Sequence, residues 1–508
     1  MLESDINYAL ISELGDSLRQ VGYSEDGLRQ AVGTSSSLTH DPRAAEVARR
    51  RLASGNTLHT LIKAFCLGIP VPTDELTHAV GGRTVDYLVR TGRVTQEQNA
   101  FVSKIAIDAA QDLLIAHDPA RRGEPLRSAH VIGLGPAPRT LAALTVRSKA
   151  RRVLDLGTGS GIHALLALKL GDEVVATDIN PRALEYTHFN VALNRLAIPT
   201  TRHGDLFAPV ADEAFDLIVA NPPYVISPDS SLYFRDSGLL GDELSRTVVR
   251  EAARHLNEDG FASILVSWTH GEKEAWDAPL AGWVRGVGCD ALLLRFRMYD
   301  PLTYASLWIK EEPEFAGTLD RWLGYYERLG IRAMSSGAVI LRRRSGINWI
   351  RSAQVRSAPI QNASAHLRQI FDASDRLSSM TDAELLEQRF RPHPNHRIHR
   401  TGVSNGGRYL VEGQSLETTA GIPLRVPLGA LGSHLLGKFN GLRSLQTVTS
   451  ELGEMPGMAS SDVVISAVQF VRQLFAFGFL EMGEPALDAR AVVDVKSADR
   501  KERSLVTS

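Results

Sequence analysis

The sequence predicts an α/β protein whose central part is a mostly parallel sheet flanked by helices. Between about residues 130 and 344, apolar runs of strand length alternate with helical patterns, which is typical of such sheets. A glycine-rich turn joins the first of these strands to the first helix, and ligands of open α/β sheets bind at this kind of turn. The chain has 508 residues, too many for one hydrophobic core, so about three domains are expected.

The central elements follow from the apolar periodicity of the segment. Five segments are predicted as strands: Arg152–Leu156, Glu173–Thr177, Phe215–Ala220, Phe261–Ser267 and Ala291–Phe296. Three patterns between them are predicted as helices: Ile162–Leu170, Arg182–Asn194 and Glu243–Leu256. This regular alternation favours one domain over residues 130–344.

The flanking parts have other patterns. Residues 1–129 are mostly helical and end in an alternating stretch near residues 101–107, an order that resembles a winged-helix module. Residues 345–484 mix strands with helices and end in a second pattern of this kind. Such modules bind nucleic acid, bind protein or cover a neighbouring domain, and the lack of an obvious basic helix favours the latter two. Residues 485–508 are polar and aperiodic, which predicts a disordered tail.

Composition excludes several classes of protein. Cys66 and Cys289 are the only cysteines, so we expect neither a disulfide framework nor a thiolate metal cluster. No apolar run reaches the roughly 18–20 residues of a membrane span, and the acidic N-terminus lacks the pattern of a secretory signal. We therefore expect a cytoplasmic protein that binds no membrane. Lys and Arg number 56 against 58 Asp and Glu, which argues against a dedicated nucleic-acid-binding protein but leaves a local basic patch possible.

The strongest motif lies between the first central strand and its helix. Asp155 ends the strand, and Gly157, Gly159 and Gly161 follow at alternate positions. The glycines allow a tight turn and close approach of the backbone to a ligand. A carboxylate at the end of the strand disfavours a diphosphate in the same turn, but it suits the cationic amino group of an amino-acid ligand.

Two further acidic residues follow at the ends of the next strands. Asp178 comes about twenty residues after the glycine turn, where ribose hydroxyls are held in folds of this type. Asp205 can accept a hydrogen bond from an adenine amino group, and Ile179 and Leu206 can enclose the ring. Each acid alone could be a cap at a strand end, but their order and spacing favour a nucleoside site.

A proline-rich loop follows the strand 215–220. Asn221, Pro222, Pro223 and Tyr224 form a stiff segment at the carboxyl end of that strand. The Asn221 amide oxygen and the proline carbonyls can accept hydrogen bonds from an N–H₂ group, and the Tyr224 ring can cover a planar substrate. We predict Asn221, Pro222 and Tyr224 as catalytic residues. A rigid surface turn is the alternative interpretation.

Together these motifs resemble the class I methyltransferases that use S-adenosylmethionine (SAM), in the branch with Asn-Pro-Pro-Tyr. The branch includes protein-glutamine methyltransferases of release factors and amino-methyltransferases of nucleic-acid bases. The resemblance covers about residues 130–344 and implies a Rossmann-like, seven-stranded domain with SAM as cofactor. It gives Asp155, Gly157, Asp178, Asp205 and Asn221 the cofactor and substrate roles described above. Pro138-Arg139-Thr140 lacks the glutamate that follows in release-factor enzymes, which is a departure from the glutamine-specific pattern.

Two weaker features concern charged residues. Arg235 and Asp236 lie in a loop similar to one in long actinobacterial-type relatives, and they are predicted as substrate contacts or as a surface ion pair. His393, His396 and His399 are interleaved with prolines and arginines but with no carboxylate or thiolate, so a solvated basic loop is favoured over a metal site.

The leading hypothesis is an enzyme that transfers a methyl group from SAM to a nitrogen of a peptide or protein, with the flanking modules recognising the substrate. The first alternative is an N-methyltransferase of ribosomal RNA or other nucleic-acid bases. Near-neutral charge disfavours it, because RNA binding depends on phosphate neutralisation. The second is an O-methyltransferase of a peptide carboxylate or a natural product.

Overall fold

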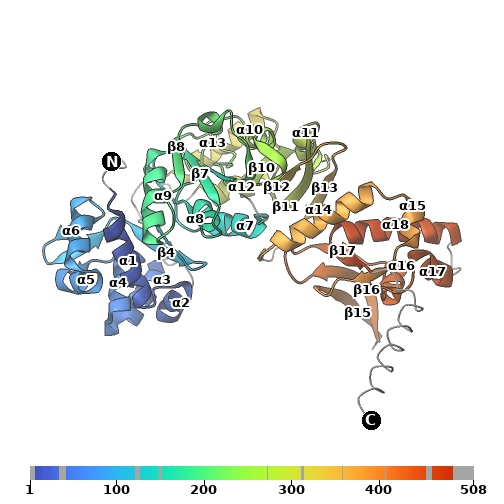
Figure 1. The fold of residues 1–508 in the computed structure, drawn as a ribbon, viewed down its shortest axis with the longest axis horizontal. Coiled ribbons are helices and arrows are strands. Elements are labelled where there is room, and N and C mark those ends of the chain that lie inside the picture. Colours follow the sequence, from blue (N-terminus) through green and yellow to red (C-terminus); the bar gives the residue numbers. More distant parts are fainter. Residues whose placement is uncertain are drawn as a thin grey trace, which may run out of the picture. The chain divides into compact units, whose positions relative to one another are not determined.

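The computed structural model describes residues 6–33, 42–120, 126–147, 152–271, 273–309, 314–356, 359–406, 408–452 and 460–483. The chain divides into two compact units, Met1–Ala353 and Gln354–Ser508 (Figure 1). The tail predicted as disordered, 485–508, lies outside the described residues. Within the described parts of the chain, no helix combines the length and apolar character that a membrane crossing requires.

A large central sheet organises the first unit and confirms the predicted mixed α/β class. Its order is β13-β11-β12-β10-β9-β6-β7-β8. The strands are β6 (Arg152–Leu156), β7 (Glu173–Asp178), β8 (Thr200–His203), β9 (Phe215–Ala220), β10 (Leu256–His270), β11 (Cys289–Tyr299), β12 (Ala333–Arg343) and β13 (Ile350–Gln354). Strands β8, β7, β6, β9 and β10 are parallel, while β12 runs antiparallel to β10 and β11.

The seven strands expected of the domain 130–344 are β6 to β12, and β13 adds an eighth strand at the edge of the sheet, outside that range. The amide of Ala291 in β11 donates to the carbonyl of Trp349, 2.9 Å away, directly before β13. The residues of β13 are exposed or half-buried and mostly polar. A short edge strand with no buried face lacks the apolar alternation by which strands are found in a sequence.

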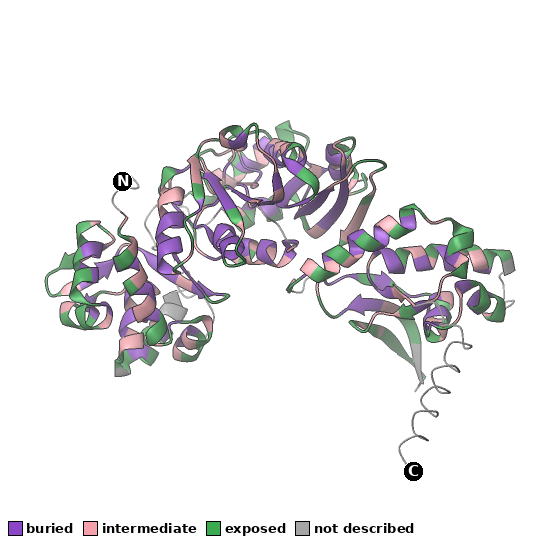
Figure 2. Ribbon diagram, viewed as in Figure 1, coloured by how far each residue is buried: buried purple, intermediate pink, exposed green. Residues whose placement is uncertain are grey.

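Helices pack on the central sheet and enclose its core. They are α7 (Pro136–Leu144), α8 (Ile162–Leu168), α9 (Pro181–Leu193), α10 (Glu243–Arg254), α11 (Ala278–Val284), α12 (Pro301–Trp308) and α13 (Phe315–Arg328). The predicted helices correspond to α8, α9 and α10. Helix α10, for example, buries Leu244, Val248 and Val249 in the same apolar cluster as Ile218 of β9 and Trp268 of β10. Figure 2 shows the strands of this sheet as mostly buried.

The N-terminal part of the first unit is built from helices and short strands. They are α1 (Tyr8–Gln20), α2 (Glu25–Val32), α3 (Pro42–Arg51), α4 (Thr57–Phe65), β1 (Val71–Pro72), α5 (Thr73–Val80), α6 (Gly82–Arg90), β2 (Val94–Glu97), β3 (Ala100–Ser103), β4 (Ala106–Ala110) and β5 (Leu113–His117). Strands β1, β3 and β2 form one sheet, and β4 pairs with β5.

Helix α9 joins the N-terminal part to the central sheet. Its Tyr186, Phe189 and Leu193 belong to the same buried cluster as Leu14 and Leu18 of α1. The two helices approach so closely that a Cβ on Gly15 would lie 2.1 Å from the carbonyl oxygen of Leu193. Each fully buried side chain of this size stabilises the packing by about 1.5–3 kcal/mol. The N-terminal part therefore forms a continuous core with α9.

The second unit holds two small sheets and several helices. The elements are α14 (Ser364–Ser378), α15 (Asp382–Glu387), β14 (Phe390–Pro392), β15 (His396–Asn405), β16 (Arg408–Thr418), β17 (Arg425–Pro427), α16 (Ala430–Lys438), α17 (Leu445–Leu452), α18 (Ser460–Ala476) and β18 (Leu480–Met482). Strands β15, β16 and β17 form one sheet, and β14 pairs with β18.

Residues 391–400 are exposed or half-buried, as predicted, but the prediction of a loop was wrong, because most of this segment lies in β14 and β15. Glu417 of β16 is buried and accepts a hydrogen bond from Arg397 at 3.2 Å, and it also pairs with His399. Burial alone would raise the pKa of Glu417, but hydrogen bonds from Arg356, Arg397 and His399 hold that pKa below its usual value. Glu417 on the neighbouring strand β16 thus neutralises cations of β15 that have no acidic residue near them in the sequence.

Candidate active site

A cavity of about 310 Å³ opens at the carboxyl ends of β6, β7 and β9. Its walls come from the glycine turn after β6, from the segments after β7, β8 and β9, and from residues 130–133 and 230–238. This is the edge of the sheet at which α/β proteins bind ligands, and the volume lies within the range of small-molecule sites.

The glycine turn forms one wall of the cavity. Gly157, Gly159 and Gly161 have positive φ angles of 69°, 55° and 83°, which side chains disfavour. The amide of Thr158 donates to the carbonyl of Thr177 at 2.9 Å and ties the turn to β7. A Cβ on Gly161 would also lie 2.9 Å from Oγ1 of Thr187 in α9. Gly161 therefore permits both the turn and the close packing of α8 on α9.

Asp155 lies beneath the turn and not on the wall of the cavity. Its carboxylate oxygen Oδ2 accepts hydrogen bonds from the Thr158 hydroxyl at 2.7 Å and from the Ala164 amide at 2.9 Å. The residue is 1% exposed, and burial raises the pKa of its carboxyl to about 6. The structure thus shows a carboxylate that shapes the turn, whereas the sequence interpretation gave it a direct ligand contact.

Asp178 and Ile179 reach the cavity from the end of β7. Asp178 accepts hydrogen bonds from the Gly159 amide at 2.9 Å and from the Asn180 amide at 2.8 Å. Burial raises the pKa of Asp178 although these hydrogen bonds oppose the shift. Ile179 is 47% exposed, so an apolar surface is available beside the carboxylate.

Asp205 and Leu206 line the cavity from the turn after β8. Asp205 is exposed, and the Gly204 amide before it donates to the Asp178 carbonyl at 3.0 Å. Leu206 has a φ of 45°, an uncommon conformation for a side chain of its size. The structure therefore brings Ile179 and Leu206 to one cavity, as the predicted ring-binding site requires.

The proline-rich loop forms the wall after β9. Asn221, Pro222 and Pro223 line the cavity, and the amide of Tyr224 donates to the Pro222 carbonyl at 2.8 Å. The Pro222 carbonyl thus accepts a hydrogen bond within this tight turn, and Asn221 brings a further acceptor, its side-chain amide oxygen, to the cavity wall. Tyr224 is not among the lining residues. It lies near Tyr299 and Tyr304, and burial raises the pKa of its hydroxyl.

The segment after this loop, in which Arg235 and Asp236 were predicted as substrate contacts or a surface ion pair, contributes another wall. Tyr233 and Phe234 line the cavity, and the buried Asp236 holds their segment in place. Its carboxylate accepts hydrogen bonds from Ser227 at 3.0 Å and from Arg235 at 2.7 Å. Arg235 also lies over the ring of Trp322 in α13, 5.8 Å from the centroid. Asp236 is buried and the Arg235 side chain is 15% exposed, so the two do not form a surface ion pair, and Asp236 also borders the cavity.

His130 also lines the cavity, and sequence reasoning missed it. Its ring is 6.0 Å from that of Phe234, and the residue is 7% exposed. Burial lowers the pKa of His130 and favours the neutral ring at pH 7. No periodic or glycine-rich pattern marks this position, because residues 130–133 lie in a loop that precedes the first strand of the central sheet.

Comparison with known proteins agrees with this geometry. Residues 134–280 match the methyltransferase small domain family, and residues 20–104 match a domain of unknown function, DUF7059. A ribosomal protein uL3 glutamine methyltransferase of Bradyrhizobium diazoefficiens is 42% identical over 123 residues, 22% of this chain and 38% of that protein. Release factor glutamine methyltransferases of Deinococcus radiodurans and Xylella fastidiosa are 35% and 34% identical, over 27% and 24% of this chain.

The chain covers 53% and 48% of those two release factor enzymes. The similarity thus concerns the domain that carries the cavity, with its glycine turn, its two acidic strand ends and its proline-rich loop. The central part of the chain is therefore similar to the methyltransferase small domain family and to glutamine methyltransferases, and it carries the Asn-Pro-Pro-Tyr motif at residues 221–224.

Proposed function

We propose that this protein transfers a methyl group from SAM to a nitrogen atom of a protein substrate. The observation that carries the proposal is the position of Asn221, Pro222 and Pro223 on the same cavity as Asp178, Ile179 and Leu206. One part of that cavity offers carboxylate and apolar groups suited to a nucleoside, and the other offers an amide oxygen suited to an N–H₂ group. The names of the relatives support a glutamine amide as the first acceptor to test.

The residues present fit SAM. We infer that Asp178 would accept hydrogen bonds from ribose hydroxyls, that Ile179 and Leu206 would enclose the adenine, and that Asp205 would accept a hydrogen bond from its amino group. Asp155 places a buried carboxylate behind the glycine turn, which favours a positive charge on the cavity side. Bound SAM supplies a methyl group on a sulfonium and leaves as a neutral thioether.

The chain itself contributes position more than acid–base chemistry. The Asn221 oxygen would accept a hydrogen bond from the acceptor N–H₂ and direct its nitrogen toward the methyl group. Positioning of this kind accounts for large rate factors when no strong base is needed. The N-terminal part and the second unit, proposed as winged-helix-like modules, would select the protein substrate.

The test is a labelling experiment with methyl-labelled SAM and a bacterial cell extract. The full chain is compared with Asn221→Ala, and the products are divided by protease and nuclease treatment. We expect label in the protease-sensitive fraction that survives nuclease and mild base, and loss of that label with Asn221→Ala. Label in nuclease-sensitive material would favour a nucleic-acid base as acceptor, and base-labile label would show transfer to oxygen.

A further inference from the structure

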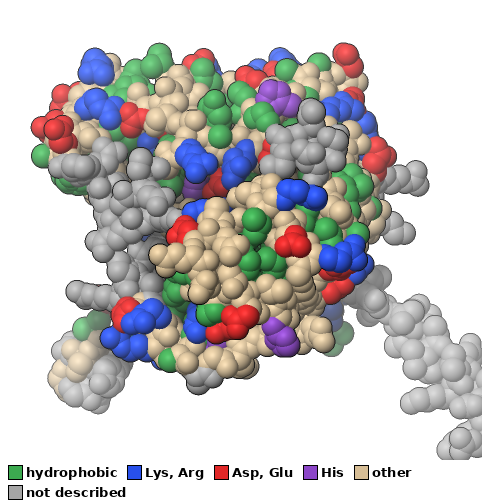
Figure 3. All heavy atoms as spheres, turned by 90° about the vertical axis from the view of Figure 1, so that its left-hand side faces the viewer, with side chains coloured by type: hydrophobic (Ala, Val, Ile, Leu, Met, Phe, Trp, Pro, Cys, Tyr) green, Lys and Arg blue, Asp and Glu red, His purple; other side chains and the backbone are tan. Residues whose placement is uncertain are grey.

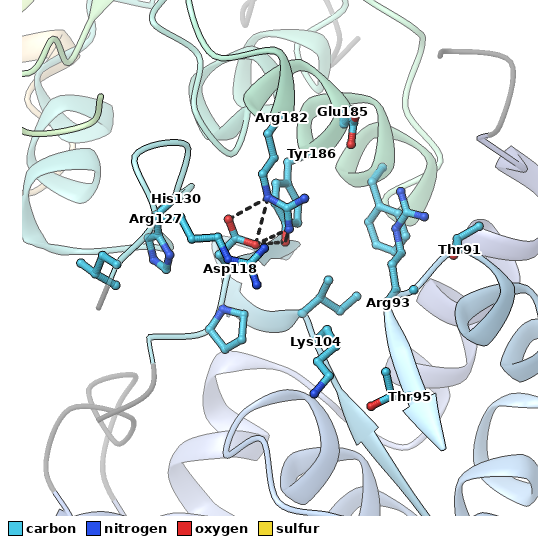
Figure 4. Close-up of a pocket in the computed structure, with 15 residues that line it drawn as sticks. Thr91, Arg93, Thr95, Lys104, Asp118, Arg127, His130, Arg182, Glu185 and Tyr186 are labelled. Carbon is cyan, nitrogen blue, oxygen red and sulfur yellow. Dashed lines mark hydrogen bonds and ion pairs between the residues drawn. The ribbon is translucent and has the colours of Figure 1, made fainter. Parts of the chain in front are cut away.

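A second cavity, of about 490 Å³, lies between the N-terminal part and helix α9 (Figure 4). Its lining residues come from the ends of β2 and β3, from the loop after β5 and from α9. The motifs and the proposed function account for none of its charged residues. Four of its side chains are cationic, Arg93, Lys104, Arg127 and Arg182, and two are acidic, Asp118 and Glu185.

One cation is satisfied within the wall of this cavity. Arg182 of α9 donates to Asp118 at 2.9 Å, and the Tyr186 hydroxyl donates to the same carboxylate at 2.8 Å (Figure 4). Burial alone would raise the pKa of Asp118, but the hydrogen bond from Arg182 keeps it below its usual value. Arg182 therefore neutralises the negative charge of Asp118, so this carboxylate does not balance the other cations that line the cavity.

Arg93 is held differently. Its guanidinium lies over the ring of Phe189, 5.0 Å from the centroid, and 6.0 Å from the centroid of Tyr87. Its Nη1 atom is buried and has no hydrogen-bond partner among the described residues. Stacking fixes the plane of the guanidinium, and Arg93 also lines the cavity. A guanidinium held in one plane suits a planar acceptor such as a carboxylate.

Lys104 is a second cation on the wall of this cavity. The Lys104 amide donates to the Arg93 carbonyl at 2.8 Å, so the backbones of the two residues pair where β2 and β3 meet. Their side chains diverge: the Arg93 guanidinium points toward α9 and the Lys104 ammonium points away from it (Figure 4). The Lys104 ammonium lies 3.9 Å from Glu97, a loose pair at the surface. The cavity therefore presents cations at separate points of its wall.

This cavity adjoins the cofactor cavity, because His130 lines both. A ligand in this cavity would therefore share the wall residue His130 with a ligand in the cofactor cavity. The geometry favours the role of a substrate anchor over that of a remote surface site.

We propose that the cavity beneath α9 binds a carboxylate of an acidic peptide segment, and that this contact anchors the protein substrate for methylation. The inference rests on the proposed function, since it assigns the segment to the substrate of that reaction. A peptide is favoured over a nucleic acid for two reasons. The cavity is enclosed by Phe189, Ile105 and Pro119 and is not an extended basic groove. On the face in Figure 3, Lys and Arg side chains are interspersed with Asp and Glu, whereas nucleic acids are bound through many phosphate contacts.

The test uses the full chain and a fluorescein-labelled peptide of ten glutamates, followed by anisotropy at low salt. Arg93→Gln should weaken binding about tenfold or more, because it removes a charged hydrogen-bond donor. Arg90→Gln is the matched control: Arg90 lies 5.9 Å from the same Tyr87 ring, but it does not line the cavity. Arg93→Lys should retain an intermediate affinity, and calorimetry with SAM should show unchanged cofactor binding in all three variants.

Equal peptide affinity for wild type and Arg93→Gln would overturn the inference, as would an equal loss in Arg90→Gln. A labelled ten-nucleotide uridine oligomer that binds more tightly than the peptide, and depends on Arg93, would overturn it in favour of a nucleic-acid site. Peptide binding is measured without methyl transfer. If Arg93-dependent binding persists while the labelling experiment finds no protein product, the proposed function fails and the peptide site stands.

Discussion

The cofactor cavity and the cavity beneath α9 share His130 but are built in different ways. The first is lined by strand ends and their turns, so its groups are close together in sequence and are held by the sheet. The second combines the end of the β2–β3 hairpin with α9, and its cations come from separate elements. The first buries its charges in hydrogen bonds to backbone amides, as at Asp178, whereas the second leaves a buried donor of Arg93 without a partner.

The difference indicates that the two cavities bind different kinds of ligand. Backbone amides from consecutive turns fix carboxylates for a ligand of constant shape, which suits a cofactor. Long cationic side chains from two elements adapt to a ligand that varies, which suits a peptide. If this holds, substitutions in one cavity change the binding of one ligand only, and substitutions between the cavities change both.

The largest effect is expected at the proline-rich loop. Asn221→Ala should lower the single-turnover rate of methyl transfer about a hundredfold, because a misplaced acceptor loses its alignment. SAM affinity should change little. Asn257→Ala is the control, since Asn257 donates to Asp216 at 2.8 Å, near the start of β9. Wild-type rates in Asn221→Ala would show that the loop is only a rigid turn.

The second largest effect is expected for SAM affinity when the contact with the ribose is lost. Asp178→Ala should weaken SAM and its demethylated product about ten- to hundredfold alike, because both carry the same ribose. Binding of the acidic peptide should be unchanged. Calorimetry with both ligands checks this, with Glu173→Ala at the opposite end of β7 as control. A variant that loses only one of the two ligands would contradict the ribose role.

The buried Asp155 predicts a smaller effect that depends on pH. Its pKa is about 6 in the folded protein against a usual value of 3.8. The contribution to stability is therefore complete below pH 3.8 and is lost as the pH rises through 6. Asp155→Asn removes this titration, so the stability of wild type relative to the variant should fall by about 1.5 kcal/mol between pH 5 and pH 8.

Urea unfolding at the two pH values measures the difference. A constant offset between wild type and Asp155→Asn would show that the carboxyl does not titrate in this range. The experiment also sharpens the comparison of the cavities, because bound SAM should lower the pKa of Asp155 whereas bound peptide should not.

The sequence allowed the cofactor cavity to be predicted because its residues follow strands in fixed order. The glycine turn, Asp178 and Leu206 are each recognised from short segments, and the sheet brings them together. Asp155 shows the limit of that reasoning. The pattern identified the residue, but only the hydrogen bonds from Thr158 and Ala164 show which way its carboxylate faces.

The cavity beneath α9 could not be predicted in this way. Arg93 and Phe189 are far apart in sequence, and they meet because α9 buries one face in the N-terminal core. Each residue alone fits an ordinary role, a surface cation or a core aromatic. The edge strand β13 was missed for a related reason, since its pairing with β11 and not its own pattern makes it a strand.

His130 provides the last and smallest test, because it is the residue that both cavities share. His130→Ala removes a buried ring whose centroid lies 6.0 Å from the centroid of the Phe234 ring. Loss of an aromatic contact costs about 0.5–1.5 kcal/mol, which is about two- to tenfold in affinity. Because the wall is common, both SAM and the acidic peptide should bind more weakly by similar factors. His130→Phe keeps a ring of similar size without the nitrogens and should restore both affinities if packing is the cause. A loss confined to one ligand in His130→Ala would show that the two cavities are independent, and the anchor role of the second would lose its structural link to the reaction.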